Sequence, residues 1–465
     1  MSEILTIESL DNEARGIARR DGKAIFVEGA LPGERVEANI FRKKPSYENA
    51  RAERILKQSF MRVEPKCPNY GVCGGCAMQH LEPSAQVAVK QRTLEDNFKH
   101  IAKLAIPQVL PAIYGPTWGY RFRARLSVRY VRKKDSVLIG FRERRGSYVV
   151  DMKECLVLPK SVSDLLLPLR QLIGDLTIKE AVPQIEVAVG DECIVLALRH
   201  MEPLIAEDIA KLEAFAAQYH VVWWTQAKGP DTLKPLHSED EHRLAYSLPQ
   251  FGLRMHYKPS DFTQVNYYIN RSLIAKALSL LAVQATDRVA DLFCGLGNFT
   301  LPLATQAREV VGIEGSSTLT DRALAAARDH HLETKTKFST LNLFDVDVEW
   351  LRDLGYFDRM LIDPPREGAF AVAKALAQLQ ENERPKRIVY VSCNPATLAR
   401  DAGVLVKQGG YRLVSAGVVN MFPHTAHVES IAVFEWHEGD QIPEPQADDE
   451  ILLDDATTGE ASTDE

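Results

Sequence analysis

From residue 256 onward the sequence alternates between strand-like apolar runs and helical stretches, and this alternation restricts the fold more than any other feature. The runs RVADLFC, EVVGIE, DRMLID and RIVYVSC are each followed by a helical stretch such as TLTDRALAAARDHH or ATLARDAGVLVKQ. Parallel strands need such crossovers, so the pattern predicts a doubly wound, mostly parallel α/β sheet. The last runs, YRLVSAGVVNM and HVESIAVFEW, have no helix between them and predict an antiparallel pair at the sheet edge.

The rest of the chain divides into three further segments. A length of 465 residues exceeds one ordinary core, so we expect several domains. Residues 1–60 carry short alternating runs separated by Gly, Pro and Asn, which predict a small β-barrel of the kind that binds oligonucleotides. Residues 61–255 mix strands and helices and predict a central α+β domain, before the α/β domain of residues 256–437. Residues 438–465 hold eleven Asp and Glu and no Lys or Arg, and we expect a disordered acidic tail.

Composition and termini indicate a cytoplasmic protein. Hydrophobic residues make up 45% of the chain and charged residues 26%, as in globular proteins. The start, MSEILTIESLDNEARG, lacks the segments of a signal peptide, and no apolar run is long enough to span a membrane. The net charge is −7, but without the tail 56 basic residues stand against 52 acidic ones, so the body carries +4.

The stretch VADLFCGLGNFTLPLA, residues 289–304, predicts a buried strand, a glycine turn and an amphipathic helix. Gly295 and Gly297 permit a tight turn and let a ligand approach the backbone. The next strand ends in Glu314, where an acid can accept hydrogen bonds from both ribose hydroxyls. A dinucleotide-binding loop would place a third glycine where Thr300 stands. The D-x-F-C-G-x-G pattern instead resembles the S-adenosylmethionine loop of class I methyltransferases.

Other polar side chains end the neighbouring strands. Asn342 closes the expected strand KFSTLNL, and Asp363 opens DPPR, whose prolines stop a strand. Ligands of open α/β sheets bind outside the carboxyl ends of the strands. We therefore expect one rim that contains Phe293, Asn298, Glu314, Asn342, Asp363 and Cys393.

Cys393 follows a buried strand in RIVYVSCNPATLARD, residues 387–401. Asn394 is a good N-cap and Pro395 suits the first position of a helix. The positive end of that helix is expected to lower the thiol pKa, which would prepare a nucleophile. The alternative is a cysteine that only fills the end of a strand.

A thiolate beside a methyl donor points to uracil chemistry. C5 of uracil is not a nucleophile, but addition of a thiolate at C6 gives an enolate with charge at C5, which can take the methyl group. A base must then remove the C5 proton, and a carboxylate in apolar surroundings suits that role. HVESIAVFEW offers Glu429 on an expected buried strand. The alternative for Glu429 is an edge-strand carboxylate that faces water.

KCPNYGVCGGCAMQH contains Cys67-x5-Cys73-x2-Cys76, and Cys155 follows in DMKECLVLP. Four thiolates with two glycines between them can surround a tetrahedral zinc ion or a [4Fe–4S] cluster. The spacing alone does not distinguish the two metals.

Taken together, these motifs resemble those of RNA uracil-5-methyltransferases, specifically the branch that acts on 23S ribosomal RNA. The resemblance covers about residues 1–437: the N-terminal barrel resembles a TRAM domain, and DFTQVN, DLFCGLGNF, DPPR, SCNP and HVES follow in the family's order. It implies a class I (Rossmann-like) methyltransferase domain, an N-terminal TRAM/OB-like β-barrel and a central α+β iron–sulfur domain. It implies Cys393 as nucleophile and Glu429 as base. S-adenosylmethionine would contact Gln264, Phe293, Asn298, Glu314, Asn342 and Asp363, and a [4Fe–4S] cluster would bind Cys67, Cys73, Cys76 and Cys155.

The implied partner is 23S ribosomal RNA, with no DNA or membrane partner, and we expect a monomer. One alternative is a related enzyme that acts on another 23S site or on transfer RNA. Another is a methyltransferase of cytosine C5 or of an amino group. A third is an RNA-binding iron–sulfur protein with an inactive methyltransferase fold.

The segment of residues 120–145 has ten basic residues against Asp135 and Glu143. Alternation is expected to place Arg121, Arg123 and Arg125 on one strand face as phosphate ligands, and the interleaved aromatics Tyr120, Phe122 and Tyr130 would stack on unpaired bases. The alternative is a solvated charged strand. The target uracil must leave its stack to reach the thiol.

Overall fold

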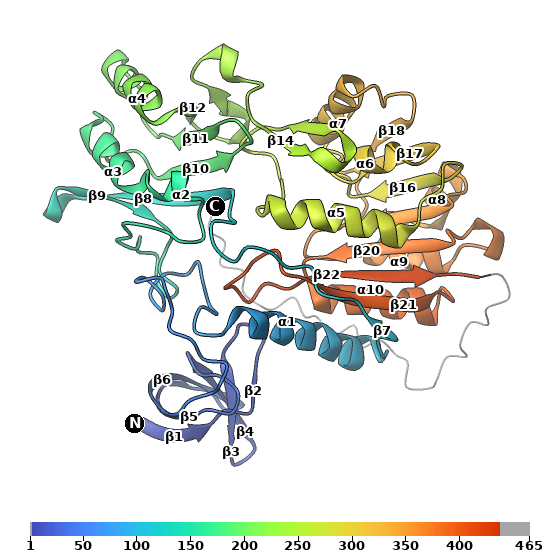
Figure 1. Cartoon of the computed structure of the whole chain (residues 1–465), viewed down its shortest axis with the longest axis horizontal. Coiled ribbons are helices and arrows are strands. Elements are labelled where there is room, and N and C mark those ends of the chain that lie inside the picture. The colour runs from blue at the N-terminus through green and yellow to red at the C-terminus, as the bar shows by residue number, and fades with distance from the viewer. Residues whose placement is uncertain (1, 438–465) are drawn as a thin grey trace.

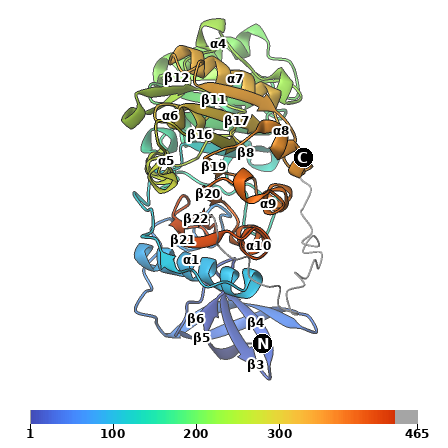
Figure 2. The same ribbon diagram turned by 90° about the vertical axis from the view of Figure 1, so that its right-hand side faces the viewer.

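The computed structural model describes residues 2–437, so the predicted acidic tail lies outside the described residues. Figure 1 shows the N-terminal strands at one end of the molecule and two larger sheets at the other. Helix α1 (Pro83–Asn97) lies between the N-terminal sheet and the C-terminal sheet in both views (Figures 1 and 2).

Six strands form the N-terminal sheet in the order β1-β5-β6-β4-β3-β2. Its core contains Ile25, Val27, Val36 and Ala50, which come from alternating strand positions, as a half-buried sheet requires. The prediction of an all-β N-terminal segment is therefore confirmed. The strands are β1 (Ser2–Thr6), β2 (Ser9–Leu10), β3 (Gly16–Arg20), β4 (Lys23–Glu28), β5 (Arg35–Lys43) and β6 (Tyr47–Lys57).

The central sheet has the order β13-β12-β11-β10-β8-β9, and the expected strands and helices are present. The apolar stretch VSDLLLPLRQLIGDL, residues 162–176, does not form one continuous helix: α2 ends at Ser163 and α3 begins at Leu166, because the ring of Pro168 would clash with the carbonyl one turn earlier and is tolerated only in a first turn. The elements are β8 (Arg123–Val131), β9 (Ser136–Gly140), α2 (Lys160–Ser163), α3 (Leu166–Asp175), β10 (Gln184–Val189), β11 (Ile194–Arg199), α4 (Ala206–Tyr219), β12 (Val221–Gln226) and β13 (Lys234–Pro235). A hairpin of β14 (Ala245–Leu248) and β15 (Leu253–His256) follows.

The C-terminal sheet has eight strands in the order β18-β17-β16-β19-β20-β22-β21-β7. The first five are parallel, and β22 runs antiparallel to both neighbours, which confirms the predicted alternation and the antiparallel final pair. The prediction that this pair forms the sheet edge is wrong: β22 lies between β20 and β21, and β7, from a much earlier segment of the chain, pairs with β21 and forms the edge. The strands are β7 (Gln108–Val109), β16 (Arg288–Leu292), β17 (Glu309–Glu314), β18 (Thr336–Thr340), β19 (Arg359–Ile362), β20 (Arg387–Ser392), β21 (Arg412–Val419) and β22 (Glu429–Glu435).

Helices cover both faces of this sheet. One face carries α5 (Tyr267–Leu281), α6 (Thr300–Ala304) and α7 (Ser317–Asp329). The other carries α8 (Val348–Leu354), α9 (Phe370–Ala377), α10 (Pro395–Lys407) and α1. The prediction that α6 is amphipathic is wrong, because all five of its residues are buried. This short helix packs on the sheet directly after the glycine loop that follows β16, which we call the cofactor loop.

The segment that contains α1 and β7 packs on the C-terminal sheet, although sequence alone grouped it with the central domain. Leu94 of α1 and Phe98 of the following π-helical turn (Phe98–Ala102) share a core cluster with Leu398 of α10. Strand β7 pairs with β21 through Gln108 and Val109. Among the helices of residues 2–437, none is long and apolar enough to cross a bilayer.

Candidate active site

The loop after β16 adopts the turn that its glycines predict. Gly295 and Gly297 have φ values of 54° and 85°, in the left-handed region. Phe293 also lies there, at 63°, which costs a residue with a Cβ roughly 1–2 kcal/mol. Backbone bonds hold the turn: the N–H of Cys294 donates to the carbonyl of Ile313 at 3.0 Å, and that of Gly297 to the carbonyl of Cys294 at 2.8 Å. A strained residue retained in such a loop is typical of a functional site.

Glu314 ends β17 beside this loop, as predicted. Its Oε2 accepts from the N–H of Gly295 at 3.1 Å, and its Oε1 accepts from the N–H of Ser316 at 3.1 Å. Two backbone donors from different loops therefore fix the carboxylate. Each oxygen keeps a free lone pair, which a pair of vicinal hydroxyls can use.

The side chain of Asn298 points into the protein, where Tyr246 and Asn270 hold it by hydrogen bonds. Its Oδ1 accepts from the hydroxyl of Tyr246 at 2.8 Å and from Nδ2 of Asn270 at 2.9 Å, and its Nδ2 donates to Oδ1 of Asn270 at 3.0 Å. One N–H of its amide remains for a ligand. Gln264 lies half-buried in the loop that precedes α5.

The strand that precedes Asn342 is shorter than predicted. β18 ends at Thr340, and Asn342 lies exposed in a turn, where its Oδ1 accepts from the N–H of Phe344 at 3.2 Å. The side chain of Phe344 reaches Phe293, with ring centroids 5.6 Å apart. Sequence analysis missed Phe344, because its pairing with Phe293 arises only when two loops meet.

Two carboxyl groups with raised pKa values, the buried Asp291 and the half-buried Asp363, lie at or after the ends of neighbouring strands. Asp291 accepts from the hydroxyl of Thr300 at 2.5 Å, and burial together with the nearby Glu314 raises the pKa of Asp291 to about 7. Asp363 follows β19, and burial and the neighbouring Glu429 raise its pKa well above the ordinary value. Thr300 thus anchors an acid at the position where a dinucleotide-binding loop would carry glycine.

The local geometry around Cys393 is as predicted, but its pKa shifts in the opposite direction. The Oδ1 of Asn394 accepts from the N–H of Ala396 at 3.0 Å, and Pro395 begins α10. Burial, then the carboxylates of Glu429 and Asp363, raise the pKa of the Cys393 thiol to about 12. The prediction of a lowered pKa is therefore wrong, because these carboxylates come from segments that are distant in sequence.

Glu429 begins β22 and is buried, with 7% of its surface exposed, so the alternative of a solvated edge carboxylate is wrong. Ser430 pairs with Ser392 across β22 and β20. Continuing this antiparallel register by one residue brings Glu429 opposite Cys393. Burial raises the pKa of Glu429 to about 7, although Lys90 and Arg366 both act to lower it.

Those two cations were not predicted. Lys90 lies on α1 with 1% of its surface exposed, and Arg366 lies in the exposed DPPR loop. Arg366 also lowers the pKa of the Cys393 thiol. No motif signals Lys90, since it lies in an unremarkable helical stretch 339 positions before Glu429 in the chain.

The four cysteines of the predicted metal site are brought together from two segments. Cys73 and Cys155 are buried and Cys67 and Cys76 are half-buried. Burial, and then the other three thiols among its neighbours, raise the pKa of Cys76 to about 12. The N–H of Gly75 points at the sulfur of Cys73, at 3.4 Å. Within residues 2–437, however, no group of three or more His, Cys, Asp or Glu side chains is arranged as a finished metal site.

The basic strand differs from its predicted role. Tyr120 is fully buried and its hydroxyl donates to the carbonyl of Pro423 at 2.8 Å, so it cannot stack on a base. The guanidinium of Arg123 donates to the carbonyls of Asp261 and Pro259, in the loop that leads to Gln264. β8 begins only at Arg123, so Arg121 does not share its face.

The other members of the segment are also engaged. Phe122 stacks on Tyr267 with ring centroids 4.7 Å apart, and the hydroxyl of Tyr130 donates to Asp135 at 2.5 Å. Arg125 remains exposed and pairs with Glu186 at 2.9 Å. Of the predicted RNA ligands on this segment, Arg125 is therefore the one that stays on an open strand face.

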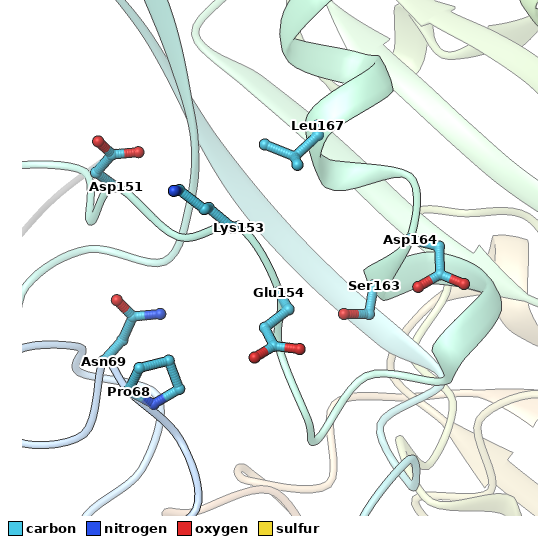
Figure 3. A pocket seen from close by; sticks show the side chains of 8 residues that line it. All are labelled: Pro68, Asn69, Asp151, Lys153, Glu154, Ser163, Asp164 and Leu167. Carbon is cyan, nitrogen blue, oxygen red and sulfur yellow. The ribbon is translucent and has the colours of Figure 1, made fainter.

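Two cavities lie beside these sites. One, of about 570 Å³, opens between the cysteine loop, through Pro68 and Asn69, and the segment that carries Asp151, Glu154 and Leu167 (Figure 3). The other, of about 330 Å³, is lined by Phe344, the DPPR loop and α9. Neither lining includes Cys393 or Glu429, so the reaction centre is defined by its side chains and not by these hollows.

Comparison with known proteins assigns this fold and site to a class. The chain belongs to the tRNA (Uracil-5-)-methyltransferase family, whose model matches residues 84–436, and a TRAM domain model matches residues 4–52. The predicted class I methyltransferase fold with an N-terminal TRAM domain is thereby confirmed, as is membership of an S-adenosylmethionine-dependent family.

Individual relatives narrow the class. The chain is 66% identical over 452 residues to the 23S rRNA (uracil(1939)-C(5))-methyltransferase RlmD of Bordetella avium, covering 97% of this chain and 93% of that protein. It is 59% identical over 443 residues to RlmD of Ralstonia pickettii, and the match covers 93% of this chain and 98% of that protein. The chain also resembles the crystal structure of Pyrococcus abyssi tRNA (uracil-54, C5)-methyltransferase in complex with S-adenosyl-L-homocysteine, with a TM-score of 0.71 and 24% sequence identity. The match covers 93% of this chain and 100% of that one and shows that the two proteins share a fold.

Proposed function

We propose that this protein transfers a methyl group from S-adenosylmethionine to C5 of a uracil in 23S ribosomal RNA, at uracil 1939. The observation that carries the proposal is the antiparallel pairing of Ser392 with Ser430, because continuing it by one residue puts Cys393 opposite Glu429 at the end of β20. Relatives that are 59–67% identical over nearly the whole chain carry this activity in their names.

The chemistry follows from the two side chains. The sulfur of Cys393, as thiolate, forms a bond to C6 of the uracil, and the electron pair of the C5–C6 double bond moves towards C5 and O4. S-adenosylmethionine, when bound, supplies an electrophilic methyl group: the bond between C5 and this carbon forms as the methyl–sulfonium bond breaks, and S-adenosylhomocysteine leaves. Glu429 then accepts the C5 proton, the C–S bond breaks, and Cys393 leaves as thiolate with the double bond restored.

The surrounding charges are suited to this order of events. A carboxylate with pKa raised to about 7 is half ionised near neutral pH and basic enough to take a proton from carbon. Arg366 is the cation on the open side of the site that lowers the pKa of the thiol. The base is buried and the nucleophile is half-buried, so the protein restricts the access of water to the covalent intermediate.

Six residues would contact the cofactor. Glu314 is placed to accept from the ribose hydroxyls, and Phe293 with Phe344 offers an aromatic surface for the adenine. Asn342 would contact the base edge, and Gln264 and Asp363 the amino-acid end, while Asn298 holds the loop through Asn270. About three strand spacings of ~4.8 Å separate the ends of β17 and β20, which suits an extended nucleoside that spans the rim.

The four cysteines would hold a [4Fe–4S] cluster, as the family resemblance implies. Four thiols and no other strong ligand type fit an iron–sulfur or zinc site. The fit is supported by their convergence from two segments and by the N–H of Gly75 directed at the Cys73 sulfur, since cluster sulfurs are commonly hydrogen-bonded. Such a cluster would tie residues 67–76 to Cys155 and so brace the central domain.

We propose the domain division expected from sequence: residues 1–60 as the TRAM barrel, 61–255 as the iron–sulfur domain and 256–437 as the methyltransferase domain, with the segment around α1 added to the last. RNA would bind as a single-stranded or flipped-out segment on a monomer. Exposed aromatic side chains suit stacking on unpaired bases. Among the described residues the most exposed are Phe60 at 95%, Tyr148 at 74%, and Tyr114 and Phe262 at 72% each.

The test is mass mapping of 23S ribosomal RNA from cells with and without the protein, together with two variants. Cys393→Ala is expected to bind S-adenosylmethionine normally and to lose methylation. Glu429→Gln is expected to accumulate a covalent protein–RNA adduct, seen as a shifted band on a denaturing gel. Methylation of transfer RNA instead, or an active Cys393→Ala variant, would overturn the proposal.

A further inference from the structure

Helix α1 sends a buried cation to the loop that leads into β22. The ammonium of Lys90 donates to Oδ1 of Asn420 at 2.8 Å and to the carbonyl of Phe422 at 2.8 Å. These two acceptors lie between β21 and β22, in residues 420–428, which we call the β21–β22 loop. An ammonium has three donors, so one N–H remains for another acceptor.

Glu429 lies near the acceptors of Lys90, because it pairs with Val419 across β21 and β22, next to Asn420. Burial lowers the pKa of Lys90 to about 7, and Glu429 is the acid that opposes this shift. Both side chains are buried, with 1% and 7% exposure, so water screens their interaction little. A buried ammonium is costly unless it is paired, which indicates that its position is of use.

Other charged or titratable groups also face Glu429, from every element packed around it. Arg366 comes from the exposed DPPR loop, Asp363 from the end of β19 and Cys393 from the end of β20. His427, in the β21–β22 loop, is near two of the same cations: burial, then Arg366 and Lys90, lower its pKa. Asp363 and Cys393 add no positive charge, and Arg366 is in contact with solvent. Lys90 is therefore the buried cation of this set.

We propose that Lys90 is a positioning residue for Glu429: its ammonium holds the β21–β22 loop and supplies the buried positive charge beside which Glu429 is ionised when it accepts the C5 proton. The inference rests on the proposed function, in which Glu429 is the base. It gives α1 a part in the release of the product.

The same helix offers a matched control. Gln86 lies one turn before Lys90, is fully buried, and accepts from the N–H of His424 in the same loop at 2.8 Å. Its amide also donates to the carbonyls of Met78 and Leu81, at 3.0 and 2.8 Å. Gln86 thus anchors the loop without charge, so Gln86→Leu removes an anchor and Lys90→Met removes an anchor together with a charge.

The experiment uses the full-length protein, S-adenosylmethionine and a 23S fragment that spans uracil 1939, in single turnovers between pH 6 and 9. Formation and decay of the covalent adduct are followed on denaturing gels. Loss of a nearby opposite charge shifts a carboxyl pKa by roughly 1–3 units, so Lys90→Met should move the acidic limb of adduct decay upward by about one pH unit or more. At pH 7 the adduct should then decay about fivefold more slowly, since a pKa raised from about 7 to about 8 lowers the ionised fraction from about one half to about one tenth.

Lys90→Arg keeps the charge, so the acidic limb of the pH dependence of adduct decay should return to its position in the parent protein. Gln86→Leu should lower the melting temperature and the rate at every pH without moving the limb. The proposal is overturned if the acidic limb of adduct decay lies at the same pH in Lys90→Met as in the parent protein. It is also overturned if Gln86→Leu shifts this limb as far as Lys90→Met does. Should Lys90→Met fail to fold, Lys90→Gln takes its place in the same comparison.

Failure of the base assignment gives a different result. If Glu429 is not the base, Glu429→Gln releases product at the parental rate whatever residue stands at position 90. If the base assignment holds and only the role of Lys90 is wrong, Glu429→Gln traps the adduct while Lys90→Met behaves like the parent.

Discussion

Ser392 pairs with Ser430 across the antiparallel strands β20 and β22, and this pairing brings Cys393 and Glu429 together at one edge of the sheet. The nucleophile and the base that we propose are only 36 residues apart in the chain, but α10 and β21 lie between them. β22 returns antiparallel beside β20, so the start of one strand meets the end of the other. A parallel strand at that position would have carried Glu429 to the opposite edge.

Arg366 should control the reactivity of the Cys393 thiol. Because this guanidinium lowers the thiol pKa, Arg366→Leu should raise the pKa further and reduce the thiolate fraction at any given pH. Alkylation of the Cys393 peptide by iodoacetamide, quantified by mass spectrometry, should slow about two- to fivefold between pH 7 and 9, as expected for an exposed cation. The difference should shrink in 1 M salt.

Glu367→Gln is the control, because it changes an exposed charge at the next position of the same loop. An unchanged alkylation rate in Arg366→Leu, or an equal change in Glu367→Gln, would show that Arg366 does not act on the sulfur.

Gly297→Ala should weaken S-adenosylmethionine binding. The residue has φ 85°, and an added Cβ would lie 3.4 Å from Leu301 and 3.6 Å from Ala323, so strain rather than a clash is the main effect. A strain of about 1–2 kcal/mol in the loop corresponds to a loss of about tenfold in affinity, measured by calorimetry.

Gly252→Ala introduces similar strain at φ 67° in the turn between β14 and β15, where a Cβ meets nothing within 4 Å. It should cost stability and leave cofactor affinity unchanged. Equal losses of affinity in both variants would mean that global stability, and not the loop, sets binding.

Arg123→Met should damage the cofactor site and not the RNA site. The guanidinium satisfies the carbonyls of Pro259 and Asp261 just before Gln264, and each buried carbonyl left unpaired costs about 1–3 kcal/mol. The KM for S-adenosylmethionine should rise and the melting temperature should fall, while the salt dependence of RNA binding stays the same.

Arg125→Met is the contrasting variant, because Arg125 is exposed on the same strand two residues later. If Arg125 contacts a phosphate, its loss should reduce the slope of log affinity against log salt by about one. If Arg123→Met changes the slope of log affinity against log salt, Arg123 contacts a phosphate of the RNA, as the sequence alone predicted.

Cys76→Ser should lose bound iron when the protein is purified without oxygen, together with the broad visible absorbance of an iron–sulfur cluster. Cys193→Ser is the matched control, since Cys193 is a buried thiol whose sulfur donates to the carbonyl of Arg243 at 3.5 Å in the central domain. Full iron content in Cys76→Ser, or zinc in place of iron in the parent, would refute the [4Fe–4S] assignment.

The order of elements and the local geometry of the site could be predicted from sequence because short-range rules decide them. Strand and helix periodicity predicted the parallel sheet, glycines predicted the turn after β16, and Asn394-Pro395 predicted the start of α10. The motif residues Glu314, Asp363 and Cys393 each follow or end a strand, so their common edge followed from sheet topology alone.

Tertiary structure decided the charges that act on those residues. The pKa of Cys393 rises because the fold buries the thiol and because Glu429 and Asp363 approach it from other strands, and the local helix end that suggested the opposite shift does not outweigh these effects. Lys90 comes near Glu429 because α1 packs against the β21–β22 loop, to which the Lys90 ammonium donates. Arg123 braces a neighbouring loop instead of facing RNA, because its guanidinium donates to carbonyls of that loop. Electrostatic interactions depend on distance and burial in space, which a linear sequence specifies only once the chain has folded.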